Sequence, residues 1–174
     1  MQVRLATQDE FQEIQAFYWQ IIDLMKNYEY EIKWKKGVYP SDEMIQTSIR
    51  RRELYVLELD KEIAGAMILN HEGNESYEQC HWSVSADEDH ILVIHALGIH
   101  PVYQGMGYGR VLVDEAIRIA KEQKQAALRL DVLEGNTPAE DLYRNAGFIY
   151  QCALPMYYED TGWTRFLLYE LPLT

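Results

Sequence analysis

Residues 104–109 of this 174-residue chain read QGMGYG, with three glycines in five positions. An apolar run, ILVIHALGI at residues 91–99, comes before them, and a helical pattern with apolar and charged side chains on opposite faces follows over residues 108–124. A strand, a glycine loop and a helix N-terminus in this order expose backbone N–H groups at the positive end of the helix dipole. The stretch therefore predicts a phosphate-binding loop, with a glycine-rich turn that binds nothing as the alternative.

Two familiar phosphate loops do not match this stretch. A Walker loop needs a lysine and then serine or threonine after its last glycine, and a dinucleotide fingerprint that starts at Gly105 and Gly107 needs glycine where Arg110 stands. A nest of backbone N–H groups binds a diphosphate without lysine, and Arg110 can add one charge-assisted contact. We therefore expect a diphosphate held mainly by the main chain.

Length and composition predict one domain, because 174 residues with 48% hydrophobic content can bury one substantial core. The sequence has no apolar run of about 18 residues and no secretory signature at its start, so we expect a soluble, cytoplasmic protein. Cys80 and Cys152 match no metal-binding or CxxC spacing, and we expect reduced thiols there.

The charge pattern limits the possible partners. A net charge of −12 argues against nucleic acid and anionic membranes. No lysine or arginine occurs between Lys61 and Arg110, whereas the stretch 72–89 contains six acidic residues. If this acidic stretch lines a cleft, it would concentrate a cationic amine; the alternative is that it only aids solubility.

The order of elements predicts a mixed α/β sheet. A T-x-x-E capping box at Thr7 and Glu10 starts a helix that runs to Met25, and Ser41 starts a shorter one. We expect strands at 3–7, 54–60, 63–71, 91–99, 127–133, 148–158 and 164–171, a helix that ends at Gly147, and a break at EDTGW, residues 159–163.

Two motifs carry a family resemblance. Gln104-x-x-Gly107-x-Gly109 resembles the (Q/R)xxGx(G/A) signature of the GNAT superfamily, the acetyl-coenzyme A (acetyl-CoA) dependent N-acetyltransferases. NTPAEDLYRNAGF is similar to the second motif of that family at Asn136, Ala139, Leu142, Tyr143, Gly147 and Phe148. The resemblance implies a single N-acetyltransferase domain over residues 1–174, with a mostly antiparallel sheet of about seven strands and helices on both faces.

The resemblance also implies where acetyl-CoA binds. The central strand and its neighbour would splay apart around the pantetheine arm, with residues 97–99 (Leu97, Gly98 and Ile99) along it. Residues 104–110 (Gln104, Gly105, Met106, Gly107, Tyr108, Gly109 and Arg110) would hold the diphosphate. Asn136 would bind the pantetheine, and no metal is implied. Gln104 replaces the arginine of many family members, which would soften affinity without removing function.

Two residues are candidates for proton transfer. By the resemblance, Tyr143 would lie beside the thioester sulfur, and a phenol pKa near 10 suits a general acid for a thiolate; the alternative is a tyrosine packed on the sheet. His95, in HALGIH, is similar in position to the histidine that takes protons in arylalkylamine N-acetyltransferases. It would be the base, with a histidine hydrogen-bonded within the sheet as the alternative. Glu72, His81 and His100 are weaker candidates.

The resemblance implies an acceptor pocket formed by Tyr28, Tyr30, Trp34 and Tyr39 together with the acidic stretch 72–89. We expect a primary amine that attacks directly, because Cys152 has no histidine beside it to activate it as a nucleophile. An acetyl-CoA sensor with little turnover and an enzyme that acts on proteins or peptides remain alternatives, as do a monomer and a homodimer.

Overall fold

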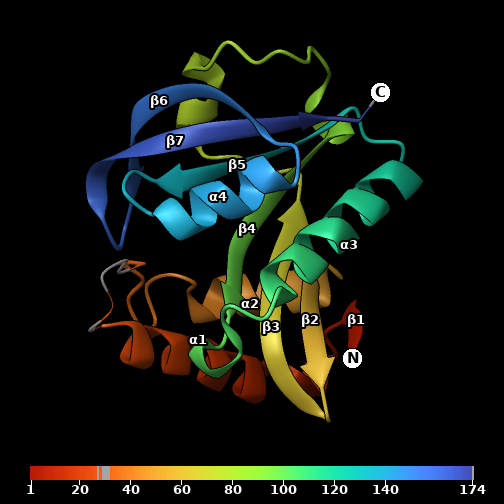
Figure 1. The fold of residues 1–174 in the computed structure, drawn as a ribbon, viewed down its shortest axis with the longest axis vertical. Helices are drawn as coiled ribbons and strands as arrows, with labels where there is room; N and C mark the ends of the chain where they lie inside the picture. The colour runs from red at the N-terminus through yellow and green to blue at the C-terminus, as the bar shows by residue number, and fades with distance from the viewer. Residues whose placement is uncertain (27, 29–31, 174) are drawn as a thin grey trace.

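The computed structural model describes residues 1–26, 28 and 32–173, which form one seven-stranded sheet (Figure 1). The strands are β1 (Gln2–Leu5), β2 (Leu54–Leu59), β3 (Glu62–Asn70), β4 (Ile91–Ile99), β5 (Ala127–Leu133), β6 (Ile149–Tyr158) and β7 (Gly162–Pro172). The α-helices are α1 (Phe11–Met25), α2 (Asp42–Arg50), α3 (Tyr108–Glu122) and α4 (Thr137–Asn145). Four 3-10 turns complete the described elements: η1 (Gln8–Glu10), η2 (Glu75–Gln79), η3 (Glu88–His90) and η4 (Pro101–Tyr103).

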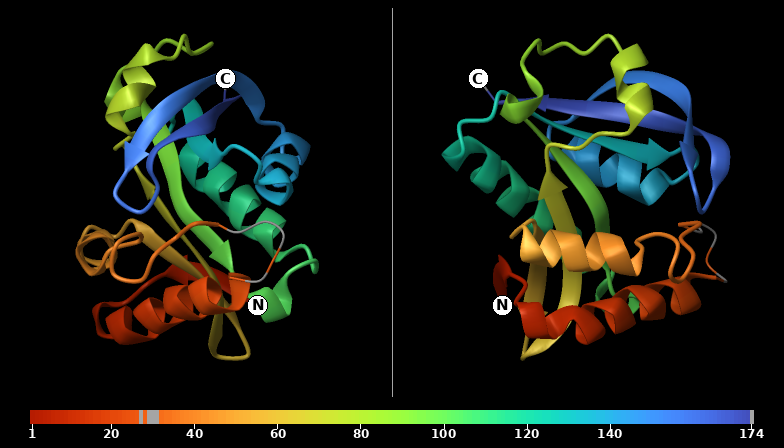
Figure 2. Two further views of the ribbon diagram at one scale, coloured as in Figure 1. Left: turned by 90° about the vertical axis from the view of Figure 1, so that its left-hand side faces the viewer. Right: turned by 180° about the vertical axis from the view of Figure 1, so that it is seen from behind.

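The sheet order is β1-β2-β3-β4-β5-β7-β6, and every neighbouring pair is antiparallel except β4 and β5. Helices α1 and α2 cover one face and helices α3 and α4 the other (Figure 2). The two faces bury separate apolar clusters, because each helix presents one apolar stripe to the sheet. The predicted mixed α/β fold with a mostly antiparallel sheet is confirmed.

Strands β4 and β5 separate soon after they meet. They pair only from Ile91 to Val93 on β4, against residues 127–129 of β5. Beyond this point β4 stays paired with β3, and β5 stays paired with β7 to its end at Leu133. The facing edges of β4 and β5 therefore leave backbone groups without a partner strand in the middle of the sheet.

A β-bulge in β4 lies beside this separation. The register with β3 shifts between the pairs His95–Ile68 and Gly98–Ala66, so β4 carries one extra residue there. Ala96 has a φ of 48°, a left-handed conformation that costs a residue with a side chain about 1–3 kcal/mol. Its carbonyl accepts a 2.8 Å hydrogen bond from the buried Tyr18 hydroxyl of α1. Helix α1 therefore supports the bulge directly.

The local predictions agree with the structure except at the first strand, which ends at Leu5 and not at residue 7, and at the last hairpin. Thr7 and Glu10 form the predicted capping box, in which the Thr7 N–H donates to the Glu10 carboxylate over 2.7 Å. The expected break at residues 159–163 is too long, because Gly162 and Trp163 already belong to β7. Trp163 pairs with Tyr157 across the hairpin, and this aromatic contact, with ring centroids 5.9 Å apart, extends the ladder beyond the sequence signal.

The expectation of reduced thiols is wrong in this structure, which pairs Cys80 and Cys152 in a disulfide with a Cα–Cα distance of 6.2 Å. Cys80 follows η2, and Cys152 lies on β6, 72 residues later. Sequence spacing could not reveal this contact, because it arises only when the segment after β3 packs against the last hairpin. The same segment is held by Arg129, which stacks on Trp82 and bonds to the buried Glu170 over 2.8 Å.

We expect Tyr18→Phe to lower the free energy of unfolding by about 1–3 kcal/mol, because it leaves the buried Ala96 carbonyl without its hydroxyl donor. Urea unfolding of the two proteins measures the difference. Tyr157→Phe is the matched control, since that tyrosine is 51% exposed, and we expect a change within about 0.5 kcal/mol there. Equal stability of Tyr18→Phe and wild type would contradict the role of this bond.

Candidate active site

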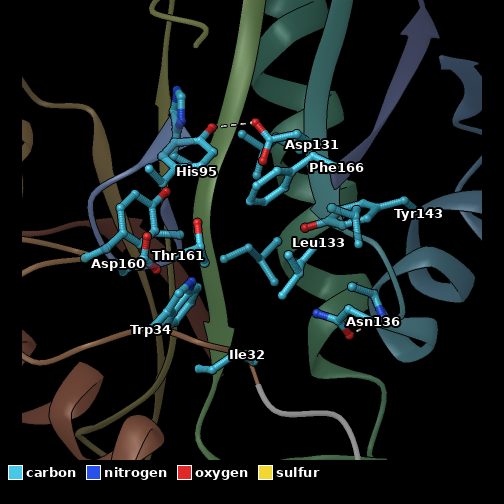
Figure 3. A pocket seen from close by; sticks show the side chains of 17 residues that line it. Ile32, Trp34, His95, Asp131, Leu133, Asn136, Tyr143, Asp160, Thr161 and Phe166 are labelled. Atoms are coloured by element: carbon cyan, nitrogen blue, oxygen red, sulfur yellow. Dashed lines mark hydrogen bonds between the residues drawn. The ribbon is translucent and has the colours of Figure 1, made fainter. Parts of the chain in front are cut away.

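Two cavities occupy the region where β4 and β5 separate. The larger, of about 400 Å³, runs along residues 97–99 of β4 to the glycine loop and the first turn of α3. The smaller, of about 130 Å³, lies between β4, β5 and the β6–β7 turn (Figure 3). Six of the described residues line both cavities: Ile32, Trp34, Leu97, Asn136, Ala139 and Tyr143. A molecule in one cavity can therefore meet a molecule in the other along these residues.

The glycine loop forms one end of the larger cavity. Gly105 and Gly107 have φ angles of 75° and 86°, and no atom lies within 4 Å of where a Cβ would stand on either. Gly107 is the N-cap residue of α3, so the first N–H groups of the helix emerge directly after it. The loop therefore combines open space with the positive end of a helix dipole, as a bound diphosphate requires.

Most residues predicted to bind acetyl-CoA line the larger cavity: Leu97, Gly98, Ile99, Gln104, Gly105, Gly107, Tyr108, Gly109, Arg110, Asn136 and Tyr143. Met106 does not line it, and its side chain is 63% exposed. The Arg110 guanidinium bonds to Asp114 and to the Asn145 carbonyl, over 2.7 and 2.9 Å. In this structure Arg110 is thus held by α3 and α4 and not by the loop.

Tyr143 projects from α4 toward the junction of the two cavities (Figure 3). It is 7% exposed, and its ring packs against Phe148 with centroids 5.6 Å apart. Burial raises its pKa, and the negative charge of Asp131 adds to this effect. The phenol consequently keeps its proton at neutral pH and is a weaker acid than an exposed tyrosine.

His95 lies on the opposite side of the smaller cavity from Tyr143 (Figure 3). Its Nε2 donates to Asn70 Oδ1 over 2.7 Å, because this oxygen can only accept; the oxygen also accepts from the Glu72 N–H. Burial lowers the pKa of His95 to about 4. The imidazole is therefore neutral at pH 7 and is a weaker base than an exposed histidine.

Two carboxylates in the smaller cavity were missed by the sequence reasoning. Asp131 lies on β5 and Asp160 in the β6–β7 turn, and both line the cavity. The sequence offered one signal, because Arg129 and Asp131 are two charged residues within an otherwise apolar strand. Asp160 resembled an ordinary turn residue, because only the folded hairpin brings it to β4.

The aromatic residues expected at the acceptor pocket lie at the two cavities. Trp34 lines both cavities, Tyr39 the smaller one and Tyr28 the larger one, whereas Tyr30 lies outside the described residues. Of the described residues that line the smaller cavity, none comes from the acidic stretch 72–89. Glu72 instead pairs with Arg51 at the surface over 2.9 Å, so the acidic side chains in the cavity come from other elements.

The residues that the structure describes contain neither a candidate metal centre nor a membrane-spanning helix. No group of three or more His, Cys, Asp or Glu side chains among them could hold a metal ion. Within the same residues, no helix has the length and apolar character needed to cross a bilayer.

The chain and its fold are similar to those of known proteins. The model of the acetyltransferase (GNAT) family matches residues 9–148, which include both motifs and both sides of the junction. The chain belongs to this family. The resemblance seen in the sequence is thereby confirmed.

Individual relatives resemble this GNAT protein over only part of its length or at low sequence identity. A mycothiol acetyltransferase of Propionibacterium freudenreichii is 33% identical over 91 residues, which are 47% of this chain and 29% of that enzyme. The chain thus spans less than a third of the length of that relative. A Salmonella typhimurium acetyltransferase solved with its cofactor acetyl-CoA has a TM-score of 0.72 at 17% identity, covering 100% of this chain and 94% of that one. A ribosomal-protein-alanine N-acetyltransferase from Brucella melitensis has a TM-score of 0.72 at 20% identity, covering 99% and 100%.

We expect Gly107→Val to weaken coenzyme A binding by at least about 100-fold, equivalent to about 2.7 kcal/mol, because its side chain would enter the space open to the diphosphate. Isothermal titration calorimetry measures this affinity. Gly37→Val is the control: Gly37 also has a positive φ, of 72°, and open space around it, but it does not line the larger cavity. Equal weakening in both variants would contradict the loop assignment.

His95 provides a pH test. We expect its imidazole NMR signals to stay constant from pH 8 to pH 5.5 and to titrate near pH 4, since burial disfavours the charged form. The unfolded chain binds a proton at this residue near pH 6.5, so His95 makes stability fall as the pH decreases from about 6.5 toward 4. His95→Gln identifies the signals by their loss. Titration near 6.5 would contradict the burial of this residue.

Proposed function

We propose that this GNAT protein transfers the acetyl group of acetyl-CoA to a primary amine by direct nucleophilic attack. The observation that supports this most is the junction of the two cavities at Leu97, Asn136 and Tyr143. The larger cavity has the loop and the strand edge that suit acetyl-CoA, and the smaller one has carboxylates that suit an amine. Neither substrate would have to cross the sheet to reach the other.

The larger cavity is proposed to bind the co-substrate through backbone groups. The amides that open α3 would take the diphosphate, and the unpaired edge of β4 at Leu97 and Ile99 would bond to the pantetheine amides as a partner strand does. Asn136 caps α4 through a 3.3 Å bond from the Ala139 N–H, and its amide would bind the arm near the thioester. These residues leave the acetyl group beside Tyr143.

The chemistry needs two proton movements. The amine nitrogen forms a bond to the thioester carbon, the C–S bond breaks, and Tyr143 would give its proton to the departing thiolate. A lysine-like amine with a pKa of about 10.4 must also lose a proton before it attacks. His95 is the acceptor that the sequence suggests for this step, through water, but a pKa of about 4 makes it a weak one, and a carboxylate in the same cavity could take its place.

The size of the smaller cavity favours a small acceptor. A space of about 130 Å³ that is walled by Trp34, Tyr39 and Phe166 suits a small amine better than a folded protein surface. We therefore propose a metabolite amine as the acceptor, and a release assay with peptides and amines side by side tests this choice.

We expect Tyr143→Phe to lower kcat by about 10- to 1000-fold with coenzyme A affinity within about threefold of wild type, because only the proton donor is removed. The assay is thiol release from acetyl-CoA over a panel of primary amines. Tyr55→Phe on β2, a tyrosine outside both cavities, serves as the control. Full activity of Tyr143→Phe would remove this residue from the mechanism, and binding without release for every acceptor would favour a sensor.

A further inference from the structure

The smaller cavity is acidic and contains no basic side chain to balance it. Asp131 and Asp160 line it, and the described residues around it include no lysine or arginine. Its other polar walls are tyrosine hydroxyls, Thr161, Asn136 and the neutral His95. Buried carboxylates are costly unless a cation or hydrogen bonds compensate them. A cationic ligand would supply this compensation.

Asp131 projects from β5 into the smaller cavity, on the same side of it as Tyr143 (Figure 3). Its Oδ2 accepts hydrogen bonds from the Tyr77 and Tyr158 hydroxyls, over 2.8 and 2.7 Å. Asp131 and Tyr143 line the same cavity, and the charge of Asp131 adds to the effect of burial in raising the pKa of Tyr143. The carboxylate is therefore fixed in orientation and lies within electrostatic reach of the proposed proton donor.

Asp160 lies on the other side of the cavity, beside Thr161 and near Trp34 (Figure 3). It is 7% exposed, and its buried Oδ1 has no hydrogen-bond partner among the described residues. An unpartnered buried oxygen costs about 1–3 kcal/mol, so it marks a position where a donor is missing. The positive charge of Lys35 acts on Asp160, but Lys35 is exposed and does not line the cavity.

Aromatic rings connect the two carboxylates. Tyr39 lies between Trp34 and Tyr158, with ring centroids 6.1 and 5.7 Å away, and Tyr158 bonds to Asp131. Tyr39 lines the same cavity as Asp131 and Asp160, and burial, with the charges of both carboxylates, raises its pKa. Aromatic faces attract ammonium groups and accept methylene chains, so the wall suits an alkyl chain with charged ends.

We propose that the acceptor carries two ammonium groups, as an α,ω-diamine does, with the reacting one at Asp131 and the distal one at Asp160. This inference rests on the proposed acetyl transfer and names its substrate class. Asp131 takes the proton from the reacting nitrogen, that nitrogen bonds to the acetyl carbon, and the thiolate leaves with the proton of Tyr143. The product keeps one positive charge, which stays at Asp160 until release.

The test compares acceptors that differ only at the distal end. Thiol release is measured with 1,4-diaminobutane, with pentylamine, which has a methyl group in place of the second ammonium, and with 4-amino-1-butanol, which has a hydroxyl there. We expect kcat/KM to be about 10- to 100-fold higher for the diamine, as one charge-assisted hydrogen bond in a buried site provides. 1,3-Diaminopropane and 1,5-diaminopentane are assayed as well, so that the result does not depend on one distance between the two ammonium groups.

Variants then assign the preference to Asp160. We expect Asp160→Asn to lower kcat/KM for the diamine by about 10- to 100-fold and to change the value for pentylamine by less than about threefold. Glu159→Gln is the matched control, because this neighbouring acid is exposed in the same turn, and it should leave both values unchanged. Asp131→Asn should lower kcat for every amine while coenzyme A affinity, measured by calorimetry, is kept.

The outcomes separate this inference from the proposed function. Thiol release without preference for any of the three diamines, or an equal loss for diamine and pentylamine in Asp160→Asn, would overturn the inference and leave acetyl transfer standing. Coenzyme A binding without thiol release for any amine would overturn the proposed function, and the inference with it. Because the preference is measured first in the wild-type protein, the test does not depend on the folding of any variant.

Discussion

The separation of β4 from β5 is the constraint on which the rest of the structure depends. The two strands share only three residue pairs, and each then continues with its outer neighbour alone. Because backbone groups inside a sheet need partners, this unpaired edge is stable only where water or a bound molecule satisfies it. The separation therefore leaves room for an extended chain in the middle of the sheet, and both cavities lie there.

The elements around this gap keep it open from two sides. The bulge at Ala96 turns β4 away from a regular ladder, and Tyr18 of α1 fixes its carbonyl. On the other side, β5 is paired over its whole length with β7, so it cannot move to close on β4. The left-handed Ala96 is an instance of backbone strain at a functional site, supported by a buried hydrogen bond from another element.

The charge distribution assigns different roles to the two sides of the gap. The side with the glycine loop offers N–H groups and the positive end of α3, whereas the side with the β6–β7 turn offers Asp131 and Asp160. An anionic carrier and a cationic acceptor are therefore drawn to opposite sides of one junction. The acidic side chains of the stretch 72–89 do not line the smaller cavity, although Tyr77 of this stretch bonds to Asp131.

Local signals in the sequence predicted the fold well, because they report short-range physics. Strand β5 has the predicted bounds, the capping box at Thr7 is formed, and the glycine loop opens α3 as expected. The disulfide, the bulge at Ala96 and the carboxylate of Asp160 were not predictable, since each depends on segments that are distant in sequence. The acidic stretch 72–89 was expected at the acceptor pocket but does not line the smaller cavity. A run of charged residues does not indicate which surface of the fold it will occupy.

The central claim is that the gap between β4 and β5 receives the carrier of the acetyl group. A crystal structure of the protein with coenzyme A tests it most directly. The account predicts the pantetheine arm between residues 97–99 and α4, with the diphosphate against the amides of residues 104–110. Coenzyme A bound elsewhere, with the edge of β4 still unpaired, would contradict it.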